Sequence, residues 1–174
     1  FPEPEMNQLE LLDPGAGVGS LSSAFLACSK KWSQVKSINL DVFEIDSVML
    51  PYLKRNLQSC ADLCQKESKT FNSRVINDDF ISNISCQVFD SAGLWKKSFK
   101  RYTHCIMNPP YKKILSSSVH RKALRSVGIE TVNLYSGFVA LSLMLLEKRG
   151  QLVAIIPRSF CNGQYYLNFR KYIN

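Results

Sequence analysis

The sequence lacks the features of several protein classes. Its six cysteines show no framework spacing, so we interpret them as reduced thiols of a cytosolic protein rather than a disulfide scaffold. With only two histidines, and no second cysteine pair beside Cys60 and Cys64, no metal site is expected. The longest apolar stretch, near residues 137–146, is too short to span a bilayer, and no signal peptide is visible. We therefore expect a cytoplasmic protein without membrane contact.

Acidic residues are missing from the middle of the chain. Residues 1–90 carry 8 basic and 12 acidic side chains, whereas residues 91–129 carry nine basic ones and no acid, within a total net charge of +8. One interpretation is an ordinary solvated surface, which is common for runs of charge. A basic segment beside a binding site also suits a polyanion such as nucleic acid.

Apolar runs bounded by turn residues predict an α/β fold. We expect strands at residues 8–12, 37–43, 74–77, 102–107 and 151–156, and helices at residues 21–31, 48–66, 134–148 and 165–172. Residues 112–133 are expected to form a mobile loop with one short helix. No repeat, low-complexity tract or linker divides the 174 residues, so one domain is predicted. Strands joined by crossover helices give a mostly parallel, Rossmann-like sheet with helices on both faces.

A glycine-rich turn follows the first predicted strand, with the sequence Asp13-Pro14-Gly15-Ala16-Gly17-Val18-Gly19-Ser20. Strand, glycine turn and helix form the first unit of nucleotide-binding α/β folds, because glycine lets the backbone bend sharply and approach a ligand. The spacing is G-x-G-x-G rather than G-x-G-x-x-G, and the Lys-Ser/Thr of a P-loop is missing. The turn therefore favours a compact, nucleoside-like ligand over a pyrophosphate or triphosphate.

Acidic residues follow the second and third predicted strands. Glu44 is placed to bind the two hydroxyls of a ribose, although it also fits an ordinary surface acid. Asp79 can accept a hydrogen bond from an adenine amino group while Phe80 lies against the ring. The alternative for this second pair is a helix N-cap aspartate followed by a core phenylalanine.

The fourth predicted strand ends in Asn108-Pro109-Pro110-Tyr111, which we call the shelf. Two prolines stop both sheet pairing and helix entry, so this segment is rigid. The Asn108 amide and the Pro109 carbonyl are two neutral acceptors, and Tyr111 offers an aromatic face. This set suits a planar amino group, as in a nucleobase or a carboxamide, and does not suit a phosphate. A simple Pro-Pro turn leaving a strand is the alternative.

Taken together, these motifs resemble those of the adenine-specific (amino-group) DNA methyltransferases. The order, glycine turn first and Asn-Pro-Pro-Tyr second, is that of the gamma group, which includes type IIG restriction–modification methylases. The resemblance covers residues 11–173. It implies a class I methyltransferase fold, S-adenosylmethionine as cofactor and double-stranded DNA as partner.

The resemblance also implies roles for individual residues. Those assigned to the cofactor are Asp13, Pro14, Gly15, Gly17 and Gly19 around its methionine part, Glu44 on its ribose, Ile45 and Phe80 on the faces of its adenine, and Asp79 on its amino group. Those assigned to the target are Asn108 and Pro109 as acceptors for its amine, Pro110 as part of the same rigid motif, Tyr111 as a stacking ring, Tyr166 or, as second choice, Phe160 as the opposing ring, and Lys112 and Lys113 on DNA.

Two departures from the family pattern concern the ends of the sequence. Residues 1–7 lack the aromatic and Thr-Pro segment that touches the methionine carboxylate in the family, and the last strands are missing as well. We therefore expect a truncated catalytic domain over residues 1–174, with its target-recognition domain elsewhere. Two other hypotheses remain: an RNA adenine or release-factor glutamine methyltransferase, and a non-catalytic remnant that only binds cofactor or nucleic acid.

Overall fold

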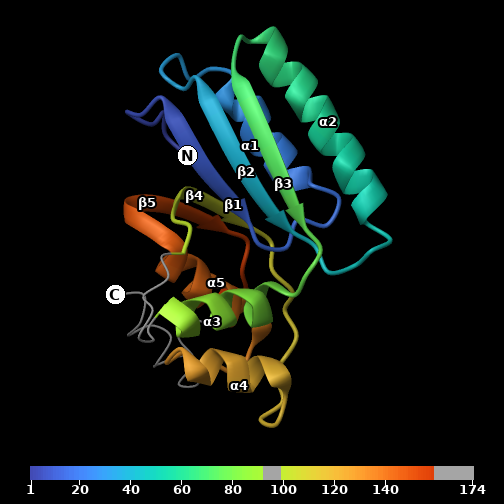
Figure 1. Cartoon of the computed structure of the whole chain (residues 1–174), viewed down its shortest axis with the longest axis vertical. Helices are drawn as coiled ribbons and strands as arrows, with labels where there is room; N and C mark the ends of the chain where they lie inside the picture. The colour runs from blue at the N-terminus through green and yellow to red at the C-terminus, as the bar shows by residue number, and fades with distance from the viewer. Residues whose placement is uncertain (92–98, 159–174) are drawn as a thin grey trace.

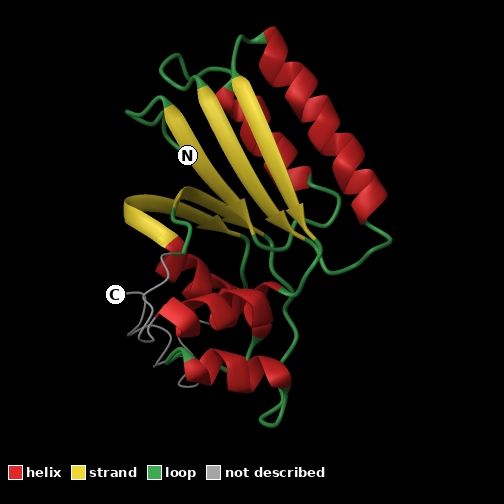
Figure 2. Cartoon of the chain, viewed as in Figure 1, coloured by secondary structure: helices red, strands yellow, loops and turns green. Residues whose placement is uncertain are grey.

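A five-stranded parallel sheet forms the centre of the molecule, whose computed structural model describes residues 1–91 and 99–158 (Figures 1 and 2). The strands are β1 (Gln8–Asp13), β2 (Ser37–Phe43), β3 (Thr70–Ile76), β4 (Tyr102–Met107) and β5 (Leu146–Ala154). Their order in the sheet is β3-β2-β1-β4-β5. The chain builds outward from β1 to β3 and then returns to the other side of β1 for β4. A topological switch point therefore lies between β1 and β4, where open α/β sheets bind ligands.

Helices cover both faces of the sheet (Figure 2). They are α1 (Ser20–Ser29), α2 (Leu50–Lys66), α3 (Phe80–Ser91), α4 (Val119–Ser126) and α5 (Leu134–Leu145). An apolar cluster containing Leu11 and Leu40 packs against α1 and α2, and a second one containing Leu12 and Phe43 packs against α3, α4 and α5. Neighbours such as Leu11 and Leu12 enter opposite cores because side chains alternate along a strand. This arrangement confirms the predicted Rossmann-like α/β fold.

One helix is missing from the sequence prediction. No helix was expected between the third and fourth strands, yet α3 lies there and places Ile81 and Ile84 in the second core. β3 also begins at Thr70 rather than at residue 74, because its backbone pairs with β2 over seven residues although several of its side chains are polar and exposed. The expected short helix within residues 112–133 is found as α4.

Within the described residues, the last two elements meet earlier than their sequence suggests, and the helix predicted at residues 165–172 lies outside these residues. α5 ends at Leu145, not at residue 148, and β5 starts at once. The Arg101 guanidinium ends the helix by donating to the carbonyl oxygens of Met144 at 2.6 Å and Leu146 at 3.2 Å. α5 is 12 residues long, and no helix within residues 1–91 and 99–158 is long and apolar enough to cross a bilayer.

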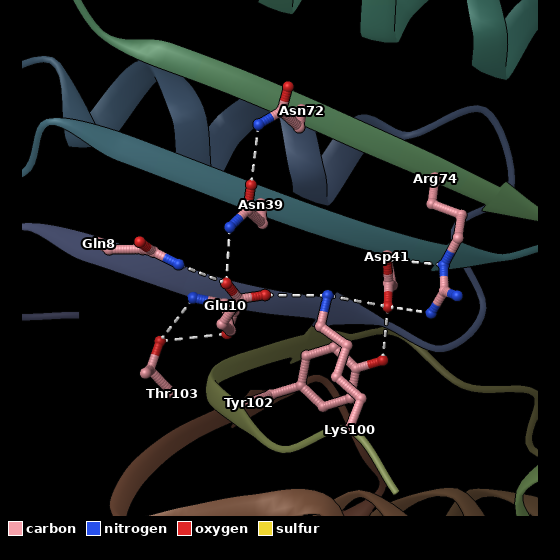
Figure 3. A network of polar contacts seen from close by, with 9 residues as sticks. All are labelled: Gln8, Glu10, Asn39, Asp41, Asn72, Arg74, Lys100, Tyr102 and Thr103. Carbon is pink, nitrogen blue, oxygen red and sulfur yellow. Dashed lines mark hydrogen bonds and ion pairs between the residues drawn. The ribbon is translucent and has the colours of Figure 1, made fainter.

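The amino-terminal half of the sheet face opposite α1 and α2 is polar (Figure 3). We call its bonded residues the polar ladder: Gln8, Glu10, Asn39, Asp41, Asn72, Arg74, Lys100, Tyr102 and Thr103. The Asn72 amide donates to the Asn39 side chain at 3.0 Å, and the Asn39 amide donates to Glu10 at 2.6 Å. The Lys100 ammonium then joins Glu10 at 2.9 Å to Asp41 at 3.2 Å. Hydrogen bonds therefore run across β3, β2 and β1 on this face.

Asp41 is the most buried acid of the polar ladder, with 3% of its surface exposed. Its carboxylate accepts from the Arg74 guanidinium at 2.6 Å and from the Tyr102 hydroxyl at 2.7 Å. Burial alone raises the pKa of Asp41, but the hydrogen bonds from Arg74, Tyr102 and Lys100 outweigh it and hold the pKa below its usual value. Asp41 is therefore a charged group satisfied entirely from within the fold.

Candidate active site at the carboxyl edge of the sheet

The residues predicted to carry function follow the carboxyl ends of four strands. The glycine turn follows β1, Glu44 follows β2, Asp79 follows β3 and the shelf follows β4. Since all the strands are parallel, these segments meet at one edge of the sheet. The glycine turn and the shelf leave the two strands that flank the switch point, β1 and β4, which pair at Leu12 and Cys105. The fold therefore brings the two motifs side by side.

The glycine turn adopts a conformation that its glycines permit. Gly17 and Gly19 have φ angles of +54° and +83°, a region that side chains with a Cβ rarely adopt. A Cβ at Gly19 would also lie 2.9 Å from the Leu53 side chain on α2. The turn is held by a backbone bond from Ala16 to the carbonyl of Phe43 at 2.9 Å. It is thus a tight turn whose backbone is fixed at the end of β1.

Asp13 lies beneath this turn and is almost completely buried, with 1% of its surface exposed. Its carboxylate accepts a hydrogen bond from the Ser22 hydroxyl of α1 at 2.7 Å. Burial raises the pKa of Asp13 to about 6, while the Ser22 hydroxyl and the Gly15 backbone N–H oppose that rise. The residue joins the end of β1 to the start of α1 and fixes the base of the turn.

Glu44 connects the end of β2 to the glycine turn. One of its carboxylate oxygens accepts from the Gly17 backbone N–H at 2.7 Å, and the other accepts from the Asp46 N–H at 2.7 Å. The next residue, Ile45, is 65% exposed. The resemblance assigns Glu44, the acceptor at the turn, to a ribose and Ile45, the exposed apolar side chain beside it, to an adenine. Both assignments stay predictions.

Asp79 and Phe80 adopt the geometry of the structural alternative. One Asp79 oxygen accepts from the Ser82 backbone N–H at 2.7 Å in the first turn of α3, and the other lies 3.1 Å from the Nε2 atom of His120. Phe80 is 2% exposed, and its ring packs 5.1 Å from both Phe43 and Phe138. Phe80 therefore belongs to the core between β2 and α5, and contact of this pair with a cofactor stays a prediction.

The shelf exposes the side chains of Asn108 and Tyr111. Asn108 is exposed, and its Oδ1 atom accepts from the Tyr111 hydroxyl at 2.8 Å. Pro109 is buried, whereas Pro110 is exposed and Tyr111 is half-exposed. The segment that follows is fixed by a backbone bond from Leu134 to the carbonyl of Lys112 at 2.9 Å. An amide oxygen and an aromatic ring are thus held together at the end of β4.

The remaining target-side predictions divide into two groups. Lys112 and Lys113 are exposed directly after the shelf, where they are open to an anionic partner. Tyr166 and Phe160, the two candidates for the opposing ring, lie outside the described residues.

A family comparison agrees with this geometry. The model of the Eco57I restriction-modification methylase family matches residues 22–174, which is most of the chain. The chain belongs to this family.

Two curated relatives of this Eco57I-type domain are type II methyltransferases. It is 47% identical over 173 residues to M.BsuBI of Bacillus subtilis, covering 99% of this chain and 33% of the relative. It is 40% identical over 169 residues to M.PstI of Providencia stuartii, covering 97% of this chain and 32% of the relative. The chain thus spans about a third of the length of the curated relatives it matches.

A solved structure shares the fold of the Eco57I-type domain. It is described as a class I S-adenosylmethionine-dependent methyltransferase of Listeria monocytogenes, and it matches with a TM-score of 0.65 at 14% identity. The match covers 97% of this chain and 45% of that one. At this identity the likeness concerns the fold, which is that of a class I methyltransferase.

Three residues that support the site were missed by sequence reasoning. The Asn56 side chain on α2 donates to the Val18 carbonyl of the glycine turn at 2.7 Å. The Asn77 side chain donates to the Glu44 carbonyl at 2.7 Å, and His120 contacts Asp79 across 41 residues of sequence. Asn77 could have been noticed because it directly precedes Asp78 and Asp79 at a strand end. Nothing local marks Asn56 or His120.

Proposed function

We propose that this domain transfers a methyl group from S-adenosylmethionine to the exocyclic N6 amine of an adenine in double-stranded DNA, as the catalytic part of a restriction–modification methyltransferase. The observation that supports this best is the placement of Asn108 at the end of β4, beside the glycine turn at the end of β1. The acceptor for the amine and the turn suited to a nucleoside-like ligand then lie together at the switch point between β1 and β4.

The residues of the glycine side fit the cofactor. The turn has glycines at positive φ, Gly17 and Gly19, so it follows a tight backbone path without side chains, and Glu44 places a carboxylate on the Gly17 N–H. S-adenosylmethionine carries a net positive charge, which suits the acidic residues 1–90. We assign its methionine part to residues 13–19, its ribose to Glu44, and its adenine to Ile45 with Asp79. When bound, this cofactor supplies an electrophilic methyl group on a sulfonium.

Asn108 and Pro109 are assigned to bind and orient the target amine. An aromatic amine is a poor nucleophile because its lone pair is delocalised into the ring. If the Asn108 amide oxygen and the Pro109 carbonyl oxygen each accept one N–H, the nitrogen becomes pyramidal and its lone pair turns toward the methyl donor. The rate gain then comes from positioning and electrostatic fit, without a covalent enzyme intermediate. Cys105 is not needed as a nucleophile, and burial raises the pKa of its thiol.

The target base has to leave the duplex to reach the shelf. A base inside a helix is shielded by its neighbours, so we propose that it is extruded and stacked on Tyr111, which is 50% exposed. Lys112 and Lys113, exposed beside Tyr111, would contact the phosphates of the distorted strand. Recognition of the DNA sequence is assigned to a domain outside these 174 residues, and a cytoplasmic location belongs to the same proposal.

A transfer assay with labelled cofactor tests this function. The full-length protein is incubated with tritium-labelled S-adenosylmethionine and, in separate reactions, with duplex DNA, RNA and a peptide release factor. We expect incorporation into DNA alone, and none with Asn108→Ala. Incorporation only into RNA or protein would replace DNA with one of the alternative substrates. Binding of the cofactor by a folded protein without transfer to any substrate would indicate a non-catalytic domain.

A further inference from the structure

The Tyr111 hydroxyl occupies a specific place on the shelf. It donates to the Oδ1 atom of Asn108 at 2.8 Å and lies 3.0 Å from the carbonyl oxygen of Ile155. Ile155 directly follows β5, and its own N–H donates to the carbonyl of Met107 at 3.0 Å. Two acceptors from neighbouring strand ends therefore converge on one donor. The ring is half-exposed and meets Tyr135 edge-on, with a centroid distance of 6.3 Å.

The hydroxyl competes with the proposed substrate for the same atom. Methyl transfer requires the Oδ1 atom of Asn108 to accept an N–H from the target amine, but in this structure that atom already accepts the Tyr111 O–H. A hydroxyl has one proton, which it divides here between two acceptors, whereas an amine brings two. An amine can therefore give one whole N–H to the Asn108 Oδ1 atom and keep the second for another acceptor, such as the Pro109 carbonyl of the proposed function.

We propose that the Tyr111 hydroxyl is an internal placeholder for the target amine: it bonds the Asn108 amide oxygen whenever no amino group is present, and an amino group displaces it. The inference rests on the proposed function and deepens it. In the free protein the hydroxyl keeps the Asn108 amide oxygen hydrogen-bonded. When a base with an exocyclic amine arrives, the hydroxyl gives up that oxygen, and the tyrosine ring is released to stack on the base.

The exchange separates bases by the group they present. A base with an exocyclic amine replaces one O–H bond to Asn108 with an N–H bond, so the exchange costs little. A base that presents a carbonyl oxygen or a hydrogen there offers no donor, so the hydroxyl stays on Asn108 and no bond is lost. A net hydrogen bond contributes about 1 kcal/mol, so without the hydroxyl the amine would gain a bond that nothing else supplies, and the preference for it would be larger on the order of fivefold. The hydroxyl therefore moderates the selectivity of the Asn108 acceptor by keeping that acceptor paired when no amine is present.

A cycle of four binding measurements tests the placeholder. Wild-type protein and Tyr111→Phe are each titrated, in the full-length protein, with a duplex carrying adenine at the target position and with one carrying purine, which has a hydrogen in place of the amine. With wild type, a purine leaves the Tyr111 hydroxyl on Asn108, whereas with Tyr111→Phe it leaves Asn108 unpaired. We expect Tyr111→Phe to increase the preference for adenine over purine by about fivefold.

Two controls restrict the interpretation of this cycle. Tyr52→Phe removes the hydroxyl of a tyrosine that is 60% exposed on α2, and it should leave the adenine preference unchanged. In an Asn108→Ala background, Tyr111→Phe should have no further effect on the preference, because the shared acceptor is gone. A preference that stays within twofold of wild type in Tyr111→Phe, or one that still changes in the Asn108→Ala background, would overturn the placeholder.

Methyl transfer measured on the same preparations separates this inference from the proposed function. If wild type methylates the adenine duplex while Tyr111→Phe leaves the preference unchanged, the placeholder alone is wrong. If wild type methylates no DNA, both the proposed function and the inference that rests on it are wrong.

Discussion

The polar ladder and the carboxyl-edge site contain similar side chains on one sheet, yet they differ in what satisfies them. In the ladder, Asp41 is buried and its partners are the side chains of Arg74, Lys100 and Tyr102. At the edge, Asn108 and Glu44 are accessible, and they accept from a hydroxyl or from backbone N–H groups nearby. Groups satisfied deep within the fold stabilise it, whereas exposed groups with local partners can exchange those partners for a ligand.

The largest expected effect is a loss of methyl transfer caused by a substitution at the carboxyl-edge site. Asn108→Ala should reduce methyl transfer by about a thousandfold or more, because its acceptor is needed only at the reacting amine. The affinity for S-adenosylmethionine should stay within about tenfold, and the midpoint of thermal unfolding should not change, since the side chain is exposed. Single-turnover transfer, cofactor titration and thermal melts measure these three quantities. Equal loss of transfer and cofactor binding would contradict the role given to Asn108.

Asp13 sharpens the comparison because it is an edge residue that is buried. Its pKa is raised from 3.8 to about 6, so the fold favours the neutral acid. The stability that this preference contributes is present below about pH 4 and is lost as the pH rises through 6. Between these limits, the free energy of unfolding of wild type should fall by about 3 kcal/mol relative to Asp13→Asn.

Urea unfolding of both proteins from pH 4 to pH 8 measures the Asp13 difference. Asp62→Asn, which changes an exposed acid on α2, serves as the control and should follow wild type at every pH. Parallel curves for wild type and Asp13→Asn would show that the carboxyl is not held neutral by the fold.

A substitution in the polar ladder should lower the stability of the fold and leave the site intact, which is the reverse of the effect expected for Asn108→Ala. Asp41→Ala leaves the Tyr102 hydroxyl and two cations without their shared acceptor, and it should lower the free energy of unfolding by about 2 kcal/mol. The value is modest because Arg74 is largely exposed and water can replace part of its bond. Cofactor affinity should be unchanged in the folded variant. Chemical denaturation with Asp62→Ala as the matched control tests this, and a variant of normal stability that no longer binds cofactor would move Asp41 into the site.

Most of the fold and the location of the site follow from local patterns in the sequence. The apolar run of β2 lies between polar and acidic residues, and its predicted and observed bounds are the same, Ser37–Phe43. The site follows because Asp13, Glu44 and Asn108 come directly after buried strands, and parallel strand ends meet at one edge.

The parts that the sequence did not predict depend on distant partners. α3 was missed because its apolar residues can be recognised as one packed face only when the second core, which includes α5, is known. The end of α5 is set by Arg101, which lies more than 40 residues earlier. The ladder joins strands whose polar residues look, one by one, like ordinary surface positions. Such pairings have no local signal, because each residue is informative only once its partner is known.

The smallest expected effect concerns the support of the glycine turn. Asn56→Ala removes the donor to the Val18 carbonyl and should weaken cofactor binding by about fivefold through loss of one hydrogen bond. The free energy of unfolding should change by less than about 1 kcal/mol, since the residue is only partly buried. Calorimetric titration with S-adenosylmethionine measures it, and Gln58→Ala on the same helix is the control. An Asn56→Ala affinity equal to that of wild type would remove Asn56 from the site.

The most direct test of the central claim is the chemical identity of the methylated product. Duplex DNA treated with the full-length protein and S-adenosylmethionine is digested to nucleosides and analysed by mass spectrometry. The arrangement of the glycine turn beside the Asn108 shelf predicts N6-methyl-2′-deoxyadenosine as the product, and its disappearance with Asn108→Ala. A methyl group found on N4 of cytosine, on a ring carbon, or on no nucleoside at all would contradict it.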